Sequence, residues 1–386
     1  MKRVIVFATT YFPLVGGAEV ALKEITDRLP MDWKIDLVCA RIRSGLPSTE
    51  KIGNVTVHRV GFGLKVDKFL LPVLGTFRAC RLEGSRDALV WSLMASFGGF
   101  TALTYCWLRP KAVMLLTLQE GDPLEHYVKR AGIFNFLHKK IFRRANSVLA
   151  ISKFLATWAK EMGFPRDPII VPNGVDVERF TKEILPERRE LIRSQFGFVN
   201  DNVVLVTASR LTLKNGVDDL IRSLTWLPSN VKVLIIGDGE DREMLKALTA
   251  TLGLGQRVVF IGQRGHDELP ELLKSSDIFI RASLSEGLGN AFLEAMAAGI
   301  PVIGTPVGGI PDFLEDETTG VFCEPRNPES IAIAVKKILA NELGLQERII
   351  DLGRRMATTI YSWKFIAEQM RQLLENWEKY RSKNTL

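Results

Sequence analysis

The sequence contains few of the residues from which metal sites and disulfide frameworks are built. Only four cysteines and four histidines occur among 386 residues, and both types are scattered along the chain. The cysteines form no CxxC pair and the histidines show no metal-ligand spacing, so neither a zinc site nor a disulfide framework is expected. This cysteine usage fits a reducing compartment, so we expect a cytoplasmic protein, and the residue spacings give no reason to expect a metal. The GLGNAF run at 287–292 is not a full GxGxxG, so no cofactor is expected either.

Several catalytic signatures are also missing. The chain has no GxxxxGK phosphate loop, no HExxH, no GxSxG and no Asp-x-Asp pair. These absences argue against a P-loop enzyme, a zinc protease and an esterase-type serine hydrolase. The lack of Asp-x-Asp also argues against a transferase that holds its substrate through a divalent metal.

Long apolar runs are rare, and only one needs weighing as a membrane span. Residues 88–108 hold 21 residues without a charge, about the length that crosses a bilayer. Gly98-Gly99 divides this run into a strand-like piece and a helix-like piece, so we expect a buried strand–loop–helix. The apolar run after Met1-Lys2-Arg3 is too short for a signal peptide and reads as a first buried strand.

The length and composition indicate a globular protein of two domains. Hydrophobic residues make up 46% and charged residues 25% of the 386, and this length exceeds what one ordinary core supports. The formal net charge is +7. Such a surplus favours anionic partners, namely phosphates, nucleic acid or an acidic membrane, without choosing among them. No nucleic-acid-binding module is present, so we expect no nucleic-acid partner.

Short β-rich runs alternate with helical patterns along both halves of the chain. Such alternation predicts parallel sheets with helices on both faces. The turn signal at Pro172-Asn173-Gly174 marks the break. We therefore predict an α/β protein with two facing, Rossmann-like, doubly wound domains at 1–172 and 173–360. The amphipathic helix expected in 361–386 would cross back to the first domain, and the ligand would bind beyond the carboxyl ends of the strands.

The densest motif is RASLSEGLGNAFLEAMAAGIPVIGTPVGGIP at 281–311. Asn290 is a good N-cap for the helix that follows, and Gly299 is a good C-terminal stop. A helix start preceded by glycines is a natural phosphate site, because free N–H groups and the helix dipole attract negative charge. The residues expected to hold the donor there are Gly287, Leu288, Gly289 and Asn290. Glu286 lies in the loop before the helix and Glu294, eight residues on, in its second turn, so one carboxylate could reach the sugar side of a bound nucleotide sugar while the other accepts ribose hydroxyls. A well-capped packing helix with two solvated glutamates is the simpler alternative.

A second motif, ASRLTLKNG at 208–216, follows a strand directly. Arg210 and Lys214 would lie in a strand-to-helix loop, where fixed cations can stabilise a leaving diphosphate. Two ordinary surface cations would give the same pattern. Gly16-Gly17, after the first strand, gives backbone room for a ligand or is simply a tight turn. Gly237-Asp238-Gly239 occupies the matching place after a later strand.

The segment 128–144 is strongly basic. It holds six cations, no acid and interleaved apolar residues. This pattern is typical of an amphipathic helix on anionic lipid, although a surface helix with its apolar face in the core reads the same way. A position on the inner face of the cell membrane is one option that this segment leaves open.

Taken in order, these pieces resemble the retaining GT-B glycosyltransferases of family 4. The resemblance covers nearly the whole chain and includes LLTLQEGDP at 115–123, PNGVD at 172–176, IIGDGE at 235–240 and the Glu286-x7-Glu294 pair. It implies two Rossmann-like domains, an acceptor-side one first and a nucleotide-sugar-binding one second. It also implies transfer of a sugar from a nucleotide-diphosphate donor, without a metal and with retention of configuration.

The resemblance assigns roles residue by residue. Glu286 is similar to the catalytic glutamate near the transferred sugar, Glu294 to the ribose-binding one, and Arg210 to the diphosphate arginine. Two positions depart from the family pattern. Members usually carry Lys directly before Gly216, where this chain has Asn215 and places Lys214 one residue earlier. Many members carry His where this chain has Gln119.

Further positions follow from the resemblance. Gly17 and Asn215 belong with the donor site, and Gly16, Gln119 and Glu120 with the acceptor or sugar side. The acceptor itself stays open, and a lipid-linked or surface-polysaccharide acceptor is one option. A nucleotide-sugar epimerase or a phosphorylase on the same fold, or a non-catalytic sugar-binding protein, are the alternative functions.

Overall fold

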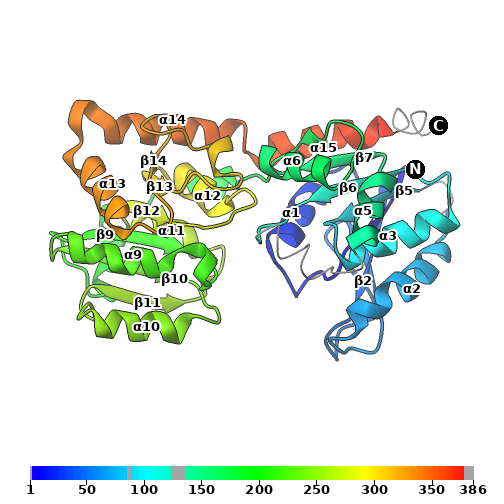
Figure 1. Cartoon of the computed structure of the whole chain (residues 1–386), viewed down its shortest axis with the longest axis horizontal. Helices are drawn as coiled ribbons and strands as arrows, with labels where there is room; N and C mark the ends of the chain where they lie inside the picture. The colour runs from blue at the N-terminus through cyan, green and yellow to red at the C-terminus, as the bar shows by residue number, and fades with distance from the viewer. Residues whose placement is uncertain (1, 85–87, 123–134, 378–386) are drawn as a thin grey trace. The chain divides into compact units, whose positions relative to one another are not determined.

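The computed structural model describes residues 2–84, 88–122 and 135–377. The chain divides into two compact units, whose elements can be followed by residue number along the colour scale of Figure 1. Unit 1 comprises residues 1–173 together with 363–386, and unit 2 comprises residues 174–362. Both units are parallel-sheet α/β structures, which confirms the predicted fold class.

Unit 1 is built on a sheet with the strand order β3-β4-β2-β1-β5-β6-β7-β8. Neighbouring strands are parallel except β3 and β4, which pair antiparallel at one edge. The strands are β1 (Lys2–Phe7), β2 (Trp33–Ala40), β3 (Thr49–Ile52), β4 (Val55–Val60), β5 (Leu89–Leu93), β6 (Met114–Leu118), β7 (Ser147–Ala150) and β8 (Ile169–Ile170). The central strands read as continuous apolar runs because both faces of the sheet are covered by helices.

The helices of unit 1 are α1 (Gly17–Thr26), α2 (Asp67–Cys80), α3 (Phe97–Leu108), α5 (Asn135–Arg144), α6 (Lys153–Glu161) and α15 (Trp363–Glu375). Helix α15 packs against α1, and its buried residues Trp363, Ile366 and Met370 join the same core as β1 and β2. The Lys2 ammonium also lies 3.0 Å from the Glu375 carboxylate. The C-terminal helix therefore belongs to the first unit, as predicted; residues 378–386 lie outside the described part.

Unit 2 is built on a sheet with the order β11-β10-β9-β12-β13-β14. Its strands are β9 (Val203–Ala208), β10 (Val231–Ile236), β11 (Val258–Gly262), β12 (Ile278–Arg281), β13 (Val302–Gly304) and β14 (Val321–Phe322), and all pair in parallel. Its helices are α7 (Val177–Thr181), α8 (Pro186–Gln195), α9 (Val217–Ser223), α10 (Arg242–Thr251), α11 (Leu269–Lys274), α12 (Asn290–Ala298), α13 (Pro328–Ala340) and α14 (Leu345–Thr359).

The uncharged stretch 88–108 forms β5 and α3, separated by a short loop. This arrangement confirms the predicted strand–loop–helix. Among the described residues, no helix combines the length and the apolar character that a bilayer crossing requires.

Candidate donor site in unit 2

The sequence motifs of unit 2 meet at the switch point of its sheet. Strands β9 and β12 are neighbours, and the chain proceeds from them toward opposite edges. In open α/β sheets, ligands bind beyond the carboxyl ends of the strands at such a point. The loops that follow these two strands, 209–216 and 282–289, contain most of the residues that were predicted to bind the donor.

The two loops approach each other so closely that only glycine fits at one contact. Gly216 has φ +64°, and a Cβ added there would lie 1.9 Å from the Ala282 carbonyl oxygen. The Leu284 N–H donates to the Lys214 carbonyl oxygen at 2.7 Å. The backbone of Lys214 is therefore fixed where the two loops meet. The Arg210 side chain is exposed to solvent.

The glycines of the TPVGG segment at 305–309 contact the backbone of Glu286 closely. A Cβ on Gly308, whose φ is +57°, would lie 1.9 Å from the Glu286 carbonyl oxygen. The Gly309 N–H donates to the same oxygen at 3.1 Å. These contacts fix the position of the Glu286 backbone and hence the point from which its side chain extends. The GTPVGG segment at 304–309 therefore supports the site through its backbone.

Arg281, which sequence reasoning did not single out, lies at the centre of the site. Its Nη2 is 2.7 Å from the Glu286 carboxylate and 3.0 Å from the Asn215 Oδ1. Its Nε donates to the Ser283 hydroxyl at 3.2 Å. Arg281 and Glu286 are both largely buried, with side chains 13% and 12% exposed. A signal for Arg281 was present: it is an arginine that ends the otherwise apolar strand IFIR.

Asn215, where the family resemblance places lysine, is fully committed to hydrogen bonds. Its Nδ2 donates to the Arg210 carbonyl oxygen at 2.5 Å, and its Oδ1 accepts from Arg281. The residue is only 1% exposed. Asn215 therefore acts on the loop and on Arg281 from inside the protein.

Helix α12 begins at the predicted place, but with a different cap. Gly289, with φ +102°, is the N-cap, and Asn290 is the first helical residue. The prediction that Asn290 caps the helix was wrong, because the left-handed turn at Gly289 shifts the boundary by one residue. The unpaired N–H groups of a helix start attract anions, and the glycine-rich segment 287–289 leads directly into it. The helix ends at Gly299, with φ +81°, as predicted.

Glu294 lies in the second turn of α12 and is half-buried. Desolvation by the surrounding protein raises its pKa to about 7, although the nearby Arg281 and Arg179 guanidinium groups lower it. Arg179 in α7 is a second residue that the motifs did not indicate. The structure thus places Glu286, Glu294 and Asn215 around one arginine, Arg281.

The predicted residues of unit 1 lie at the corresponding end of its own sheet. Gly16 caps α1, and its N–H donates to the Glu19 carboxylate at 2.8 Å. A Cβ on Gly17 would meet no atom within 4 Å, so there is open space beside the helix start. The Thr9 and Ser96 hydroxyls are 2.9 Å apart and tie together the loops that follow β1 and β5.

Gln119 and Glu120 follow β6 and differ in exposure. The Gln119 Oε1 accepts a hydrogen bond from Asn173 at 2.9 Å. Glu120 is 1% exposed, and its carboxylate accepts the backbone N–H groups of Ala95 at 2.9 Å and Gln119 at 2.8 Å. Burial raises the pKa of Glu120 to about 7 despite these bonds. Its carboxylate therefore holds the loop between β5 and α3 in place through the Ala95 N–H.

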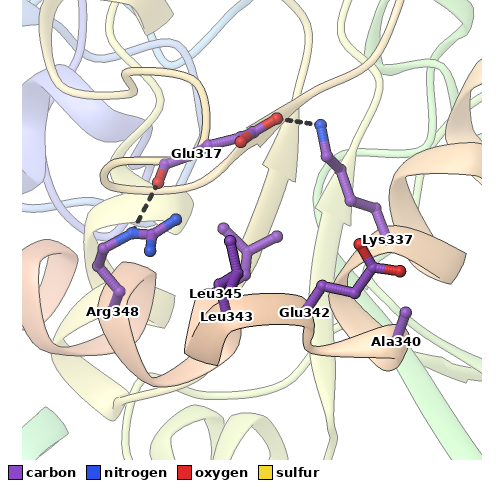
Figure 2. A pocket seen from close by; sticks show the side chains of 7 residues that line it. All are labelled: Glu317, Lys337, Ala340, Glu342, Leu343, Leu345 and Arg348. Carbon is purple, nitrogen blue, oxygen red and sulfur yellow. Dashed lines mark hydrogen bonds and ion pairs between the residues drawn. The ribbon is translucent and has the colours of Figure 1, made fainter.

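Other features of the described residues do not coincide with the predicted donor residues. Figure 2 shows a surface hollow lined by α13, α14 and the turn at Glu317, where Glu317 pairs with Lys337 and accepts from Arg348. Its charged residues are exposed and largely satisfied by one another. Within residues 2–84, 88–122 and 135–377, no cluster of three or more histidine, cysteine, aspartate or glutamate side chains is arranged to hold a metal ion.

Two family models match this chain, one in each half. The model described as Glycosyltransferase Family 4 matches residues 15–179. The model described as Glycosyl transferases group 1 matches residues 188–356. Together they span most of the chain and correspond closely to the two units.

Known proteins with similar sequences include two transferases. The uncharacterized glycosyltransferase MJ1607 of Methanocaldococcus jannaschii is 33% identical over 208 residues, covering 53% of each chain. A GDP-mannose-dependent alpha-(1-6)-phosphatidylinositol monomannoside mannosyltransferase of Mycolicibacterium smegmatis is 32% identical over 214 residues, covering 53% of this chain and 55% of its own. Each alignment thus spans about half the length of the relative.

Among solved structures, Anabaena HepE in complex with UDP and glucose is similar in fold. Its TM-score is 0.79 at 20% identity, and the match covers 97% of this chain and 100% of that one. At this level of identity, the likeness concerns the fold.

Proposed function

Because this chain belongs to the family 4 glycosyltransferases and has the two parallel-sheet units of their fold, we propose that it is a retaining hexosyltransferase. It moves a hexose from a nucleotide-diphosphate sugar to an acceptor hydroxyl. The observation that carries the proposal is the meeting of cations, a helix start and two glutamates at the sheet switch point of unit 2.

In this proposal, unit 2 binds the donor and unit 1 supplies the acceptor side. Arg210 and Lys214 neutralise the diphosphate, and the helix start formed by 287–290 contributes N–H donors. Glu294 accepts the ribose hydroxyls, for which its raised pKa is favourable, since a partly protonated carboxyl can both donate and accept. Glu286 lies on the sugar side.

The chemical step then needs no protein base. The bond between the sugar's anomeric carbon and the diphosphate oxygen breaks, and the electron pair goes to the phosphate. The acceptor oxygen attacks the same face of the anomeric carbon, and its proton moves to the departing phosphate oxygen. Fixed cations stabilise this developing charge. Such a route tolerates Gln119, which cannot act as a base.

A donor screen tests this proposal. Wild-type protein incubated with UDP-, GDP- and ADP-hexoses should release one nucleoside diphosphate in the presence of a suitable acceptor. Arg210→Ala, Lys214→Ala and Glu286→Ala should each lower that rate by about 10²–10³-fold, as expected for loss of a transition-state contact. Arg355→Ala, at an exposed position of α14, is the matched control and should retain activity.

Full activity in all three variants would refute the assignment of Arg210, Lys214 and Glu286 to the active site. Activity that disappears with a chelator and returns with a divalent ion would remove the proposal of metal-free charge neutralisation. An isomerised donor without acceptor dependence would favour an epimerase, and phosphate-dependent release of a sugar phosphate would favour a phosphorylase.

We also propose that the protein works at an anionic membrane surface on the cytoplasmic side, with a lipid-linked acceptor. Of the basic segment 128–144, residues 128–134 lie outside the described part. The described helix α5 buries His138, Ile141 and Phe142 but leaves Phe136 and Lys140 exposed. The Lys140 ammonium lies 5.4 Å from the Phe136 ring centroid.

The neighbouring helices support this proposal. Helix α3 packs against both α5 and α2 (Figure 1). Side chains exposed on these helices are Phe69, Val73, Phe77, Trp107 and Leu108. Apolar residues flanked by cations suit the interface of an acidic bilayer. The mycobacterial relative, whose name includes phosphatidylinositol monomannoside, also supports a lipid-linked acceptor.

Vesicle sedimentation tests the membrane proposal. Wild-type protein should sediment with vesicles containing phosphatidylglycerol but not with neutral phosphatidylcholine vesicles. Lys139→Glu/Lys140→Glu and, separately, Phe69→Ser/Phe77→Ser should each reduce sedimentation. Arg144 should not be changed, because its guanidinium donates to the Pro110 and Ala112 carbonyl oxygens and holds the fold. Sedimentation that neither double variant alters would refute the proposal.

A further inference from the structure

Arg281 occupies a position that a purely structural role does not explain well. It lies at the carboxyl end of β12 beside the sheet switch point, where its guanidinium contacts Glu286, Asn215 and Ser283. A largely buried ion pair contributes little net stability, because desolvation offsets its attraction. The Arg281–Glu286 pair therefore adds little to the stability of the fold, but it fixes a guanidinium group at the donor site.

The surroundings of Asn215 explain why a cation is needed there. The family resemblance places a lysine at this position, and an amide cannot supply its charge. Asn215 is instead anchored to the Arg210 carbonyl oxygen through Nδ2 and presents Oδ1 to Arg281 at 3.0 Å. The residue that replaces the lysine thus orients another permanent positive charge.

The Arg281 guanidinium has more N–H donors than these contacts use. Its contacts with the described residues engage Nε and Nη2. Arginine carries five N–H donors in a fixed fork, so Nη1 remains able to bind a phosphate oxygen. Because Glu286 belongs to the sugar side of the proposed site, the phosphate nearest Arg281 is the sugar-proximal one, which is the β-phosphate.

We propose that Arg281 binds the donor β-phosphate and, together with Asn215, supplies the positive charge that the family pattern places directly before Gly216, in addition to the charge of Lys214. Without donor, Arg281 neutralises Glu286. With donor bound, it also contacts the diphosphate and stabilises the charge that the departing group acquires. This inference rests on the proposed function, since it presumes that unit 2 binds a nucleotide diphosphate.

Calorimetric binding of nucleotides tests the inference without knowledge of the sugar or the acceptor. Screening UDP, GDP and ADP on the wild type identifies the base. The corresponding monophosphate is then measured beside the diphosphate. In Arg281→Gln, diphosphate affinity should fall about 10–100-fold, the range for a charge-assisted phosphate contact, and monophosphate affinity should change less than about threefold.

A second variant distinguishes phosphate binding from mere support of the loop. Asn215→Lys combined with Arg281→Gln returns a cation to position 215 and should recover most of the preference for diphosphate over monophosphate. Arg355→Gln, which removes an exposed arginine of the same unit, should leave both affinities unchanged. Thermal unfolding of each variant checks that unit 2 remains folded.

Each other outcome has a definite meaning. If Arg281→Gln weakens monophosphate and diphosphate equally, or neither, the inference is overturned and the proposed function survives. Failure of the double variant to recover the preference would overturn the exchange of roles between positions 215 and 281. If the wild type binds no nucleoside diphosphate, the proposed function fails, and the inference fails with it.

Discussion

At the scale of single residues, the donor site depends on glycines that let backbones approach each other. Gly216 and Gly308 each have positive φ and each face a carbonyl oxygen that a Cβ would reach at 1.9 Å. Their role is therefore steric as well as conformational. Gly197 is a natural comparison, because its φ is +74° and a Cβ there would meet nothing within 4 Å.

This difference predicts unequal effects of alanine. Gly197→Ala should cost about 1 kcal/mol of stability, the strain of a left-handed residue alone. Gly216→Ala must in addition separate the loops 209–216 and 282–289, so it should cost clearly more and lower donor affinity at least 10-fold. Denaturant unfolding and nucleotide calorimetry measure both effects. Equal costs at the two positions would show that the loops are free to separate.

Glu120 predicts a pH dependence of stability. Burial raises its pKa from 4.5 to about 7, so the folded state keeps a proton that the unfolded state has lost. Stability should therefore fall as pH rises from about 4.5 to 7, by roughly 3 kcal/mol in total, and stay reduced above that range. Thermal unfolding from pH 5 to 8 should show this decline in wild type.

The variant Glu120→Gln should lack this part of the pH profile, because its amide stays neutral. Glu83→Gln, at a side chain that is 91% exposed in the same unit, should keep the wild-type slope. Parallel profiles for wild type and Glu120→Gln would mean that Glu120 remains ionised in the fold.

At the scale of elements, most of the regular structure follows from local patterns. The helix predicted next to Asn290 appears as α12 (Asn290–Ala298) and ends at Gly299 as predicted, and α13 (Pro328–Ala340) begins directly after its cap Asn327. The strand Thr49–Ile52 was not predicted. It alternates exposed and half-buried residues on an edge, so it lacks the apolar run by which the buried strands are recognised.

The site was less predictable than the elements. Motif spacing identified Glu286 and Glu294 because they surround one helix start. Arg281 was missed because its role depends on β12 lying beside β9, a pairing of residues about 70 positions apart that no local pattern reveals. The hydrogen bonds of the buried Glu120 carboxylate were missed for the same reason, since its partner Ala95 lies in the loop that follows a different strand, β5.

Helix α15 should contribute strongly to the stability of unit 1. Ile366 and Met370 are 0% and 1% exposed in the core shared with α1. Ile366→Ala and Met370→Ala should each cost about 2–5 kcal/mol, the range for truncating a buried side chain. Lys364→Ala, on the exposed face of the same helix, should change stability by less than about 0.5 kcal/mol. Denaturant unfolding followed in unit 1 measures the difference.

At the scale of the whole molecule, each unit has its own hydrophobic core. A ligand that binds one unit should stabilise that unit by mass action. A nucleoside diphosphate at 100 times its dissociation constant should add about 2.7 kcal/mol to unit 2. Hydrogen exchange should show the gain in segments 203–216 and 281–309, while the core strands of unit 1 should change little. Equal protection of both cores would contradict a donor site built by unit 2.

The return of α15 to unit 1 makes that unit discontinuous in sequence, since residues 174–362 are inserted between its two parts. During translation, unit 2 is complete once its uninterrupted segment has emerged. Unit 1, although begun first, lacks Trp363, Ile366 and Met370 until α15 has been synthesised. The ribosome therefore finishes the second unit before it can finish the first, and a nascent chain arrested near residue 362 would expose the α1 face that awaits its last helix.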